Sequence, residues 1–268
     1  MDLITFLLLL LGGCAAGLVA GYSGVGAGII IVPLLLVYYK AAGVTSLVAT
    51  HLAFGTSLFV VVFGAALSVY RSRTEGHVLW RTALIMGCSG VLGAAAGSLA
   101  AGDLPESTLK RIFGALVLLA AFQLFTNRRK PGIRPDPPLI EVRMAAAGAF
   151  TGSVSALGGI GGGVLFFPFL YSYFLVPLKK ASDTSGVVSL MTAAAASAGY
   201  LYAGLHEPLL PPAVVGFVDP LHALPLILGA LPCFIAGASL GSRSRIPALQ
   251  KMLGVFLVVM ALKMLLAP

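Results

Sequence analysis

Two clusters of glycine hold the residues with the clearest potential for chemistry. The first cluster is Gly24, Gly26 and Gly28, the second is Gly159, Gly161 and Gly163, and a proline follows each cluster five residues later. Glycine allows left-handed backbone and a close approach of the main chain to a ligand. Each cluster also precedes a short apolar run, and a helix N-terminus presents unpaired N–H groups with partial positive charge. Two such ends directed at one point would bind an anion through the backbone.

A second interpretation of the glycines is purely structural, because small residues let membrane helices pack closely. One cluster alone would favour packing. Two clusters, followed by Pro33 and Pro168 at corresponding positions, favour the anion site.

Four polar side chains near the clusters are candidates for supporting roles. Thr50 and Ser185 are expected to donate hydroxyl hydrogen bonds to an anion, with bonding to their own helix carbonyls as the alternative. His51 lies well inside an apolar segment, so it is a candidate for proton coupling, with simple packing as the alternative. Asp183, after two lysines, is expected to cap the start of a helix.

The composition places these residues in a membrane. The chain has 268 residues, of which 59% are apolar and only 10% charged, and its mean hydropathy is +1.01. Soluble domains carry about 25% charged residues, so aqueous enzymes and nucleic-acid-binding proteins are excluded. The three cysteines, Cys14, Cys88 and Cys233, lie singly in apolar stretches, so we expect no metal site, redox pair or cofactor.

Apolar runs divide the chain into ten segments, several of which reach the roughly 20 residues of a membrane-spanning helix. They are residues 3–20, 28–39, 46–70, 82–101, 108–126, 143–157, 163–174, 182–204, 221–241 and 248–266. Residues 127–142 form a long polar, proline-rich stretch that predicts a central linker. We therefore expect a first membrane unit at 1–126 and a second at 143–268.

The two units resemble each other, as the halves of many transporters do. A shift of 135 residues superposes six identical residues and places Thr50 on Ser185. The identities are Gly24 on Gly159, Gly26 on Gly161, Gly28 on Gly163, Pro33 on Pro168, Leu35 on Leu170 and Tyr38 on Tyr173.

The distribution of basic residues predicts the topology. If segments 3–39 and 143–174 each crossed the membrane once, the two sides of the membrane would carry nine and eight of the 17 basic residues. If each segment forms a hairpin, the two sides carry 13 and four. The second distribution is the asymmetry expected of a real topology, with the basic side cytoplasmic. Each unit is then a glycine-tipped hairpin plus three transmembrane helices, and the second is inverted relative to the first. Both termini are predicted to lie outside the cell and the linker inside. The charge distribution does not distinguish re-entrant from fully spanning hairpins, because both return the chain to the side from which it entered.

The chain resembles the sulfite exporter TauE/SafE family of membrane permeases. The resemblance rests on GYSGVGAGIIIVPLLL at 21–36, LGGIGGGVLFFPFL at 157–170 and KKASDTSGVVSL at 179–190. It implies transport of sulfite, sulfonates or related sulfur-containing anions across the plasma membrane, linked to protons. Two departures leave the substrate open: Ala27 stands where the second cluster has Gly162, and His51 lies opposite Gly186.

Two other functions stay open at this level. A small-anion channel could use the same helix ends. An intramembrane serine protease could use Ser23, in the pattern Gly21-Tyr22-Ser23-Gly24, with His51 as its base; Gly158 at the repeat position of Ser23 argues against it. Whether the protein forms a homodimer also stays open.

Overall fold

The computed structural model describes the whole chain except residues 1, 25, 127–139, 206, 209, 212–213, 244–246 and 267–268. The described residues confirm the predicted all-α membrane fold, because a helix stands at each of the ten predicted apolar segments and no strand element is present among them. The helices are α1 (Leu3–Ser23), α2 (Gly28–Ala41), α3 (Ser46–Glu75), α4 (Trp80–Gly102), α5 (Glu106–Thr126), α6 (Ile140–Leu157), α7 (Gly163–Pro168), α8 (Leu178–Ala203), α9 (Pro220–Arg243) and α10 (Pro247–Leu266). A π-helical turn, η1 (Phe169–Tyr173), continues α7.

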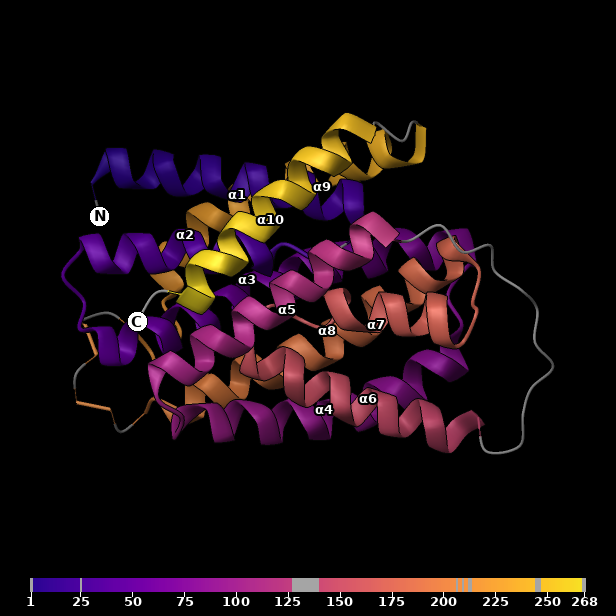
Figure 1. Cartoon of the computed structure of the whole chain (residues 1–268), viewed down its shortest axis with the longest axis horizontal. Coiled ribbons are helices and arrows are strands. Elements are labelled where there is room, and N and C mark those ends of the chain that lie inside the picture. Colours follow the sequence, from indigo (N-terminus) through magenta and orange to yellow (C-terminus); the bar gives the residue numbers. More distant parts are fainter. Residues whose placement is uncertain are drawn as a thin grey trace.

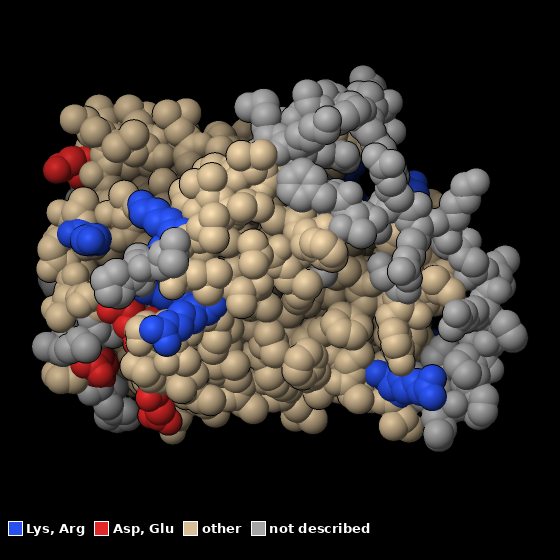
Figure 2. Space-filling view, in the orientation of Figure 1, with Lys and Arg blue, Asp and Glu red and all other residues tan. Residues whose placement is uncertain are grey.

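Five of the described helices are long and apolar enough to cross a membrane, and they are α1, α3, α4, α8 and α9. By contrast, α2 has 14 residues, or about 21 Å at 1.5 Å per residue, which is less than the roughly 30 Å hydrocarbon core of a bilayer. The face drawn in Figure 2 carries a broad uncharged belt between charged side chains at its two ends. This is the surface expected of a multi-pass membrane protein.

Glycines form the turns between α1 and α2 and between α6 and α7, where the sequence predicted the hairpin tips. α1 ends at Gly24, whose φ of 71° is left-handed and whose N–H donates to Ala20 O; this is a common way to end a helix. The second hairpin turns between α6 and α7, where Gly158 N donates to Val154 O. In each hairpin a short helical arm follows a longer one.

Small residues bring the long helices into close contact. α1 packs along α9, α6 packs along α4, α5 packs on α10, and α3 packs on α8 (Figure 1). On α1, a Cβ atom added at Gly13, Gly17 or Gly21 would overlap a backbone carbonyl oxygen of α9. Glycines four residues apart thus let two helix backbones approach closely, as small residues do in membranes.

The pairing of helices is that expected of two related halves, since α1 pairs with α9 as α6 pairs with α4. The inverted relation itself stays a prediction. The start of α1 and the end of α10 lie toward the left of Figure 1, whereas α5 ends and α6 begins toward the right. Residues 127–139 of the predicted linker lie outside the described residues, and the remaining residues, 140–142, belong to α6.

Candidate functional site

The two glycine turns meet inside the molecule. A Cβ atom added at Gly28 would lie only 2.5 Å from Ile160 O, and one added at Gly163 would lie 3.7 Å from Gly24 O. The turn between α1 and α2 therefore contacts the turn between α6 and α7. The two glycine clusters, which the sequence predicts to come together, are in contact in the structure.

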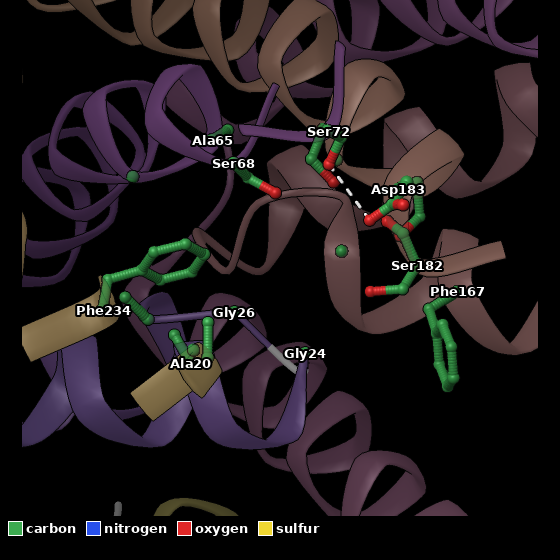
Figure 3. Close-up of a pocket in the computed structure, with 18 of the residues that line it drawn as sticks. Ala20, Gly24, Gly26, Ala65, Ser68, Ser72, Phe167, Ser182, Asp183 and Phe234 are labelled. Atoms are coloured by element: carbon green, nitrogen blue, oxygen red, sulfur yellow. Dashed lines mark hydrogen bonds between the residues drawn. The ribbon is translucent and has the colours of Figure 1, made fainter. Parts of the chain in front are cut away.

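A cavity of about 900 Å³ opens beside this contact. Its walls are the end of α1, both glycine turns, the C-terminal half of α3, the N-terminal half of α8 and the C-terminal half of α9. Figure 3 shows Ser68 and Ser182 directing their hydroxyls toward the space between α3 and α8, with Gly24 and Gly26 on another side. The cavity is large enough for a small organic anion and accompanying water.

The six predicted glycines divide into two groups by what surrounds them. Gly24, Gly26 and Gly163 line the cavity. Gly28 packs against Ile160, as described above. At Gly159 an added Cβ atom would lie 2.6 Å from the ring of Phe54, and at Gly161 it would lie 2.6 Å from Val61 Cγ1, so these two glycines pack against α3.

Two helices begin at the cavity, and their first backbone N–H groups precede the intrahelical hydrogen bonds. In α2 the bonds begin with Ile30 N and Ile31 N, which donate to Ala27 O. In α7 they begin with Leu165 N and Phe166 N, which donate to Gly162 O. The N–H groups before these residues lie at the positive ends of the helices, where an anion is stabilised.

Charged and hydroxyl side chains add to the positive helix ends. The cavity-lining polar residues on α3 and α8 are Ser68, Arg71, Ser72, Lys179, Ser182, Asp183, Ser185 and Ser189. Arg71 and Lys179 provide two positive charges, and Ser68, Ser182 and Ser189 provide hydroxyl donors. The hydroxyls of Ser72 and Ser185 donate within the protein. Nothing local in the sequence shows that Arg71 and Lys179 lie beside the glycine turns, so neither could be predicted as a site residue.

Of the two predicted hydroxyl donors, only Ser185 lines the cavity. Its hydroxyl donates to Ser182 O, one turn earlier in α8, at 2.8 Å. This is the alternative that the sequence left open. Thr50 is fully buried elsewhere on α3 and donates to Glu106 Oε1 at 3.0 Å, at the start of α5.

His51 lies outside the cavity lining. Its Nε2 is 3.0 Å from Ala101 O, and its ring stacks on Phe217 with 5.0 Å between centroids. Val61, the first residue of α3 at the cavity, is ten residues further along, or about 15 Å. The side chain of Ser23, the other member of the hypothetical protease pair, lies outside the described residues.

The prediction that Asp183 caps a helix is wrong. α8 begins at Leu178, and Pro177 occupies the N-cap position. The helix starts earlier because Pro177 lacks the backbone N–H that a preceding helical turn would need, and the lysines that follow Leu178 are good helix formers. The Asp183 side chain instead lies at the cavity and accepts a hydrogen bond from Ser72 Oγ at 3.0 Å (Figure 3).

A second polar cluster, which the sequence did not predict, lies at the other ends of α2 and α9. Asp219 is buried, and its Oδ2 is 2.6 Å from His222 Nδ1 and accepts a hydrogen bond from Tyr39 Oη at 3.2 Å. His222 Nε2 is 2.6 Å from Tyr38 Oη. Asp219 followed by Pro220 is a helix-start pattern, and Asp219 Oδ1 indeed accepts from His222 N. Among the described residues, no group of three His, Cys, Asp or Glu side chains could hold a metal ion.

Known proteins resemble this chain over almost its whole length. A protein of Haemophilus influenzae named "Probable membrane transporter protein" is 28% identical over 269 residues, covering 98% of this chain and all of the relative. Relatives with similar names in Methanocaldococcus jannaschii and Bacillus subtilis are 27% and 24% identical, covering 97% and 98% of this chain and 95% and 98% of the relatives. No solved structure matches the chain significantly.

The family comparison agrees with the architecture. The pattern of the family described as "Sulfite exporter TauE/SafE" matches residues 9–264, which include both glycine turns and every wall of the cavity. The chain is therefore a multi-pass membrane protein of a membrane transporter family, and it belongs to the sulfite exporter TauE/SafE family.

Proposed function

We propose that this protein is a secondary transporter that exports sulfite, a sulfonate or a related small sulfur-containing anion, coupled to protons. The observation that carries the proposal is the cavity at which both glycine turns, Arg71 and Lys179 converge. Sulfur oxyanions present several oxygen acceptors around one atom. Backbone N–H groups, serine hydroxyls and basic side chains are the donors that such acceptors require.

In this proposal the anion is held between the two halves of the chain. Gly24 and Gly26 would provide backbone from the first half, and Gly163 would provide it from the second. The predicted roles of Gly28, Gly159 and Gly161 become indirect, because their close packing supports the turns. Ser185 contributes through its place on α8, while Thr50 supports α3 through Glu106.

The cavity suits alternating access, in which one end of the molecule is open and the other closed. It extends from the glycine turns to Arg71 near the end of α3 and Lys179 near the start of α8. Both residues belong to the side predicted to be cytoplasmic. At the opposite ends of α2 and α9, the contacts of Tyr38 and Tyr39 with His222 and Asp219 hold the helices together. We assign the structure to an inward-open state in the plasma membrane, with both termini outside.

Flux measurements on purified protein in liposomes test the proposal. Currents on a solid-supported membrane would be recorded with sulfite, sulfate, methanesulfonate and acetate. We expect saturable currents and counterflow with sulfur oxyanions. A small-anion channel would give voltage-driven flux without counterflow, and a protease would cleave a peptide and transport nothing. Absence of flux with every sulfur anion would refute the proposed substrate class.

A further inference from the structure

Asp183 is a carboxylate in a cavity otherwise suited to an anion. It lines the same space as Arg71, Lys179 and the glycine turns. Its side chain is 17% exposed, and its Oδ2 is 4.0 Å from His77 Nδ1. Ser72 Oγ donates to its Oδ1, so the side chain is held at the junction of α3 and α8. A fixed negative charge at this position opposes the binding of a second negative charge.

The surroundings of Asp183 define what can respond to pH. His77, after α3, lies 4.0 Å from the carboxylate, and Arg71 on α3 and Lys179 on α8 line the same cavity. The cavity-lining residues of α1, α9 and the two glycine turns are uncharged. Among the described lining residues, Asp183 is the one carboxylate that an anion entering this space would meet.

From this arrangement we infer that Asp183 is the proton-binding group that couples anion transport to protons, an inference that rests on the proposed function. Binding of the anion brings a like charge close to the carboxylate, which favours protonation of one carboxylate oxygen. By linkage, the protonated carboxyl group strengthens anion binding by the same factor. Anion and proton then load together and leave together, so net export proceeds when the outward gradient of the anion exceeds the inward gradient of protons.

The inference moves proton coupling away from His51, the candidate chosen from the sequence. His51 lies about 15 Å along α3 from the first cavity residue, so its charge acts on the anion only at long range. Asp183 shares the cavity with the anion and needs no relay. If His51 carries the proton, His51→Gln should abolish proton coupling; if Asp183 carries it, Asp183→Asn should.

The decisive measurement is methanesulfonate affinity as a function of pH, because this anion keeps one charge across the range used. Isothermal titration between about pH 5 and pH 8 would compare the parent with Asp183→Asn. The asparagine retains an oxygen acceptor for Ser72 and imitates the protonated acid. Both proteins would carry His77→Gln, because a histidine 4.0 Å from the carboxylate also titrates in this range. With the carboxylate present, we expect affinity to fall by up to about tenfold for each unit rise in pH, whereas with Asp183→Asn it should stay constant. At the upper pH the variant is then expected to bind more tightly than the parent.

Two control variants separate coupling from structure. Asp219→Asn makes the same change at a buried carboxylate outside the cavity lining, and it should retain the parent's pH dependence. Ser72→Ala keeps the carboxylate but removes the hydrogen bond to its charged form, so it should retain a pH dependence with a displaced midpoint. In liposomes, Asp183→Asn should still catalyse methanesulfonate counterflow but should no longer accumulate it in response to a proton gradient.

A direct measurement on the parent does not depend on any variant folding. Addition of saturating methanesulfonate to weakly buffered protein should cause proton uptake, read with a pH indicator. Absence of proton uptake would overturn the assignment. So would an Asp183→Asn variant whose affinity changes with pH as steeply as the parent's, or a loss of pH dependence in His51→Gln or Asp219→Asn. Reduced affinity of Asp183→Asn at every pH would show a purely structural role. Absence of methanesulfonate binding would count against the proposed function itself.

Discussion

Replacement of Gly163 by alanine tests the anion site with little disturbance of the fold. Gly163 has no left-handed φ, so alanine introduces no backbone strain there. The nearest atoms to its added Cβ atom would be Ser189 Oγ at 3.5 Å and Gly24 O at 3.7 Å. These are ordinary contact distances, and all three residues line the cavity. The methyl group would therefore occupy the space between the turns without displacing protein atoms.

The size of the effect follows from the hydrogen bonds that the methyl group would block. A hydrogen bond to a charged group contributes about 1.5–3 kcal/mol. Loss of one such bond weakens binding about tenfold to 100-fold. Alanine at the start of α7 is itself expected to leave folding stability unchanged or raise it by up to about 1 kcal/mol. Anion affinity and protein stability should thus change in opposite directions, or affinity alone should change.

Gly161→Ala is the matched control, since it makes the same substitution two residues earlier. Gly161 has a φ of 76°, and its added Cβ atom would lie 2.6 Å from Val61 Cγ1. Strain and overpacking there should cost about 1–3 kcal/mol of stability. Because Gly161 does not line the cavity, the protein that remains folded should bind the anion as the parent does.

Isothermal titration with a sulfur anion, together with thermal unfolding without ligand, would measure both quantities for the parent and the two variants. Parent-like affinity in Gly163→Ala would refute the reasoning that the anion sits between the glycine turns. In that case the serines and basic residues of α3 and α8 would be the next positions to vary.

Three further predictions address topology and packing. In a variant with its three native cysteines replaced by serine, a cysteine at Asp2 should react with an impermeant reagent on whole cells, whereas one at Lys180 should be protected; the reverse pattern would invert the topology. Asp219→Ala should lower stability by about 3–5 kcal/mol, because it leaves buried partners of the carboxylate unpaired; a denaturation midpoint equal to that of Asp219→Asn would contradict this. Gly17→Val should separate α1 from α9, since the added atoms overlap Ala230 O, and an unchanged unfolding temperature would show that the contact is unimportant.

Much of the fold could be predicted because its signals are local. Long apolar runs predicted the helices, and glycines before short apolar runs predicted the turns at Gly24 and Gly159. Such signals depend only on neighbouring residues and on the bilayer, which satisfies no backbone polar groups and so demands helices. The start of α8 was mispredicted for the same local reason: Asp183 resembles a helix cap, but the helix begins at Leu178, with Pro177 at its N-cap.

The sequence by itself determined that the chain lies in a membrane, that it forms ten helical segments and that two glycine turns interrupt them. Only the tertiary structure decided which glycines face a cavity, because the surroundings of a Cβ position depend on the helix packed against it. Gly161 meets Val61 of α3, whereas Gly163 faces Gly24 and Ser189. The tertiary structure also brought Arg71 and Asp183 to one cavity from positions more than 100 residues apart, through the packing of α3 on α8. No local pattern encodes that pairing, since it arises from the shapes of whole helices.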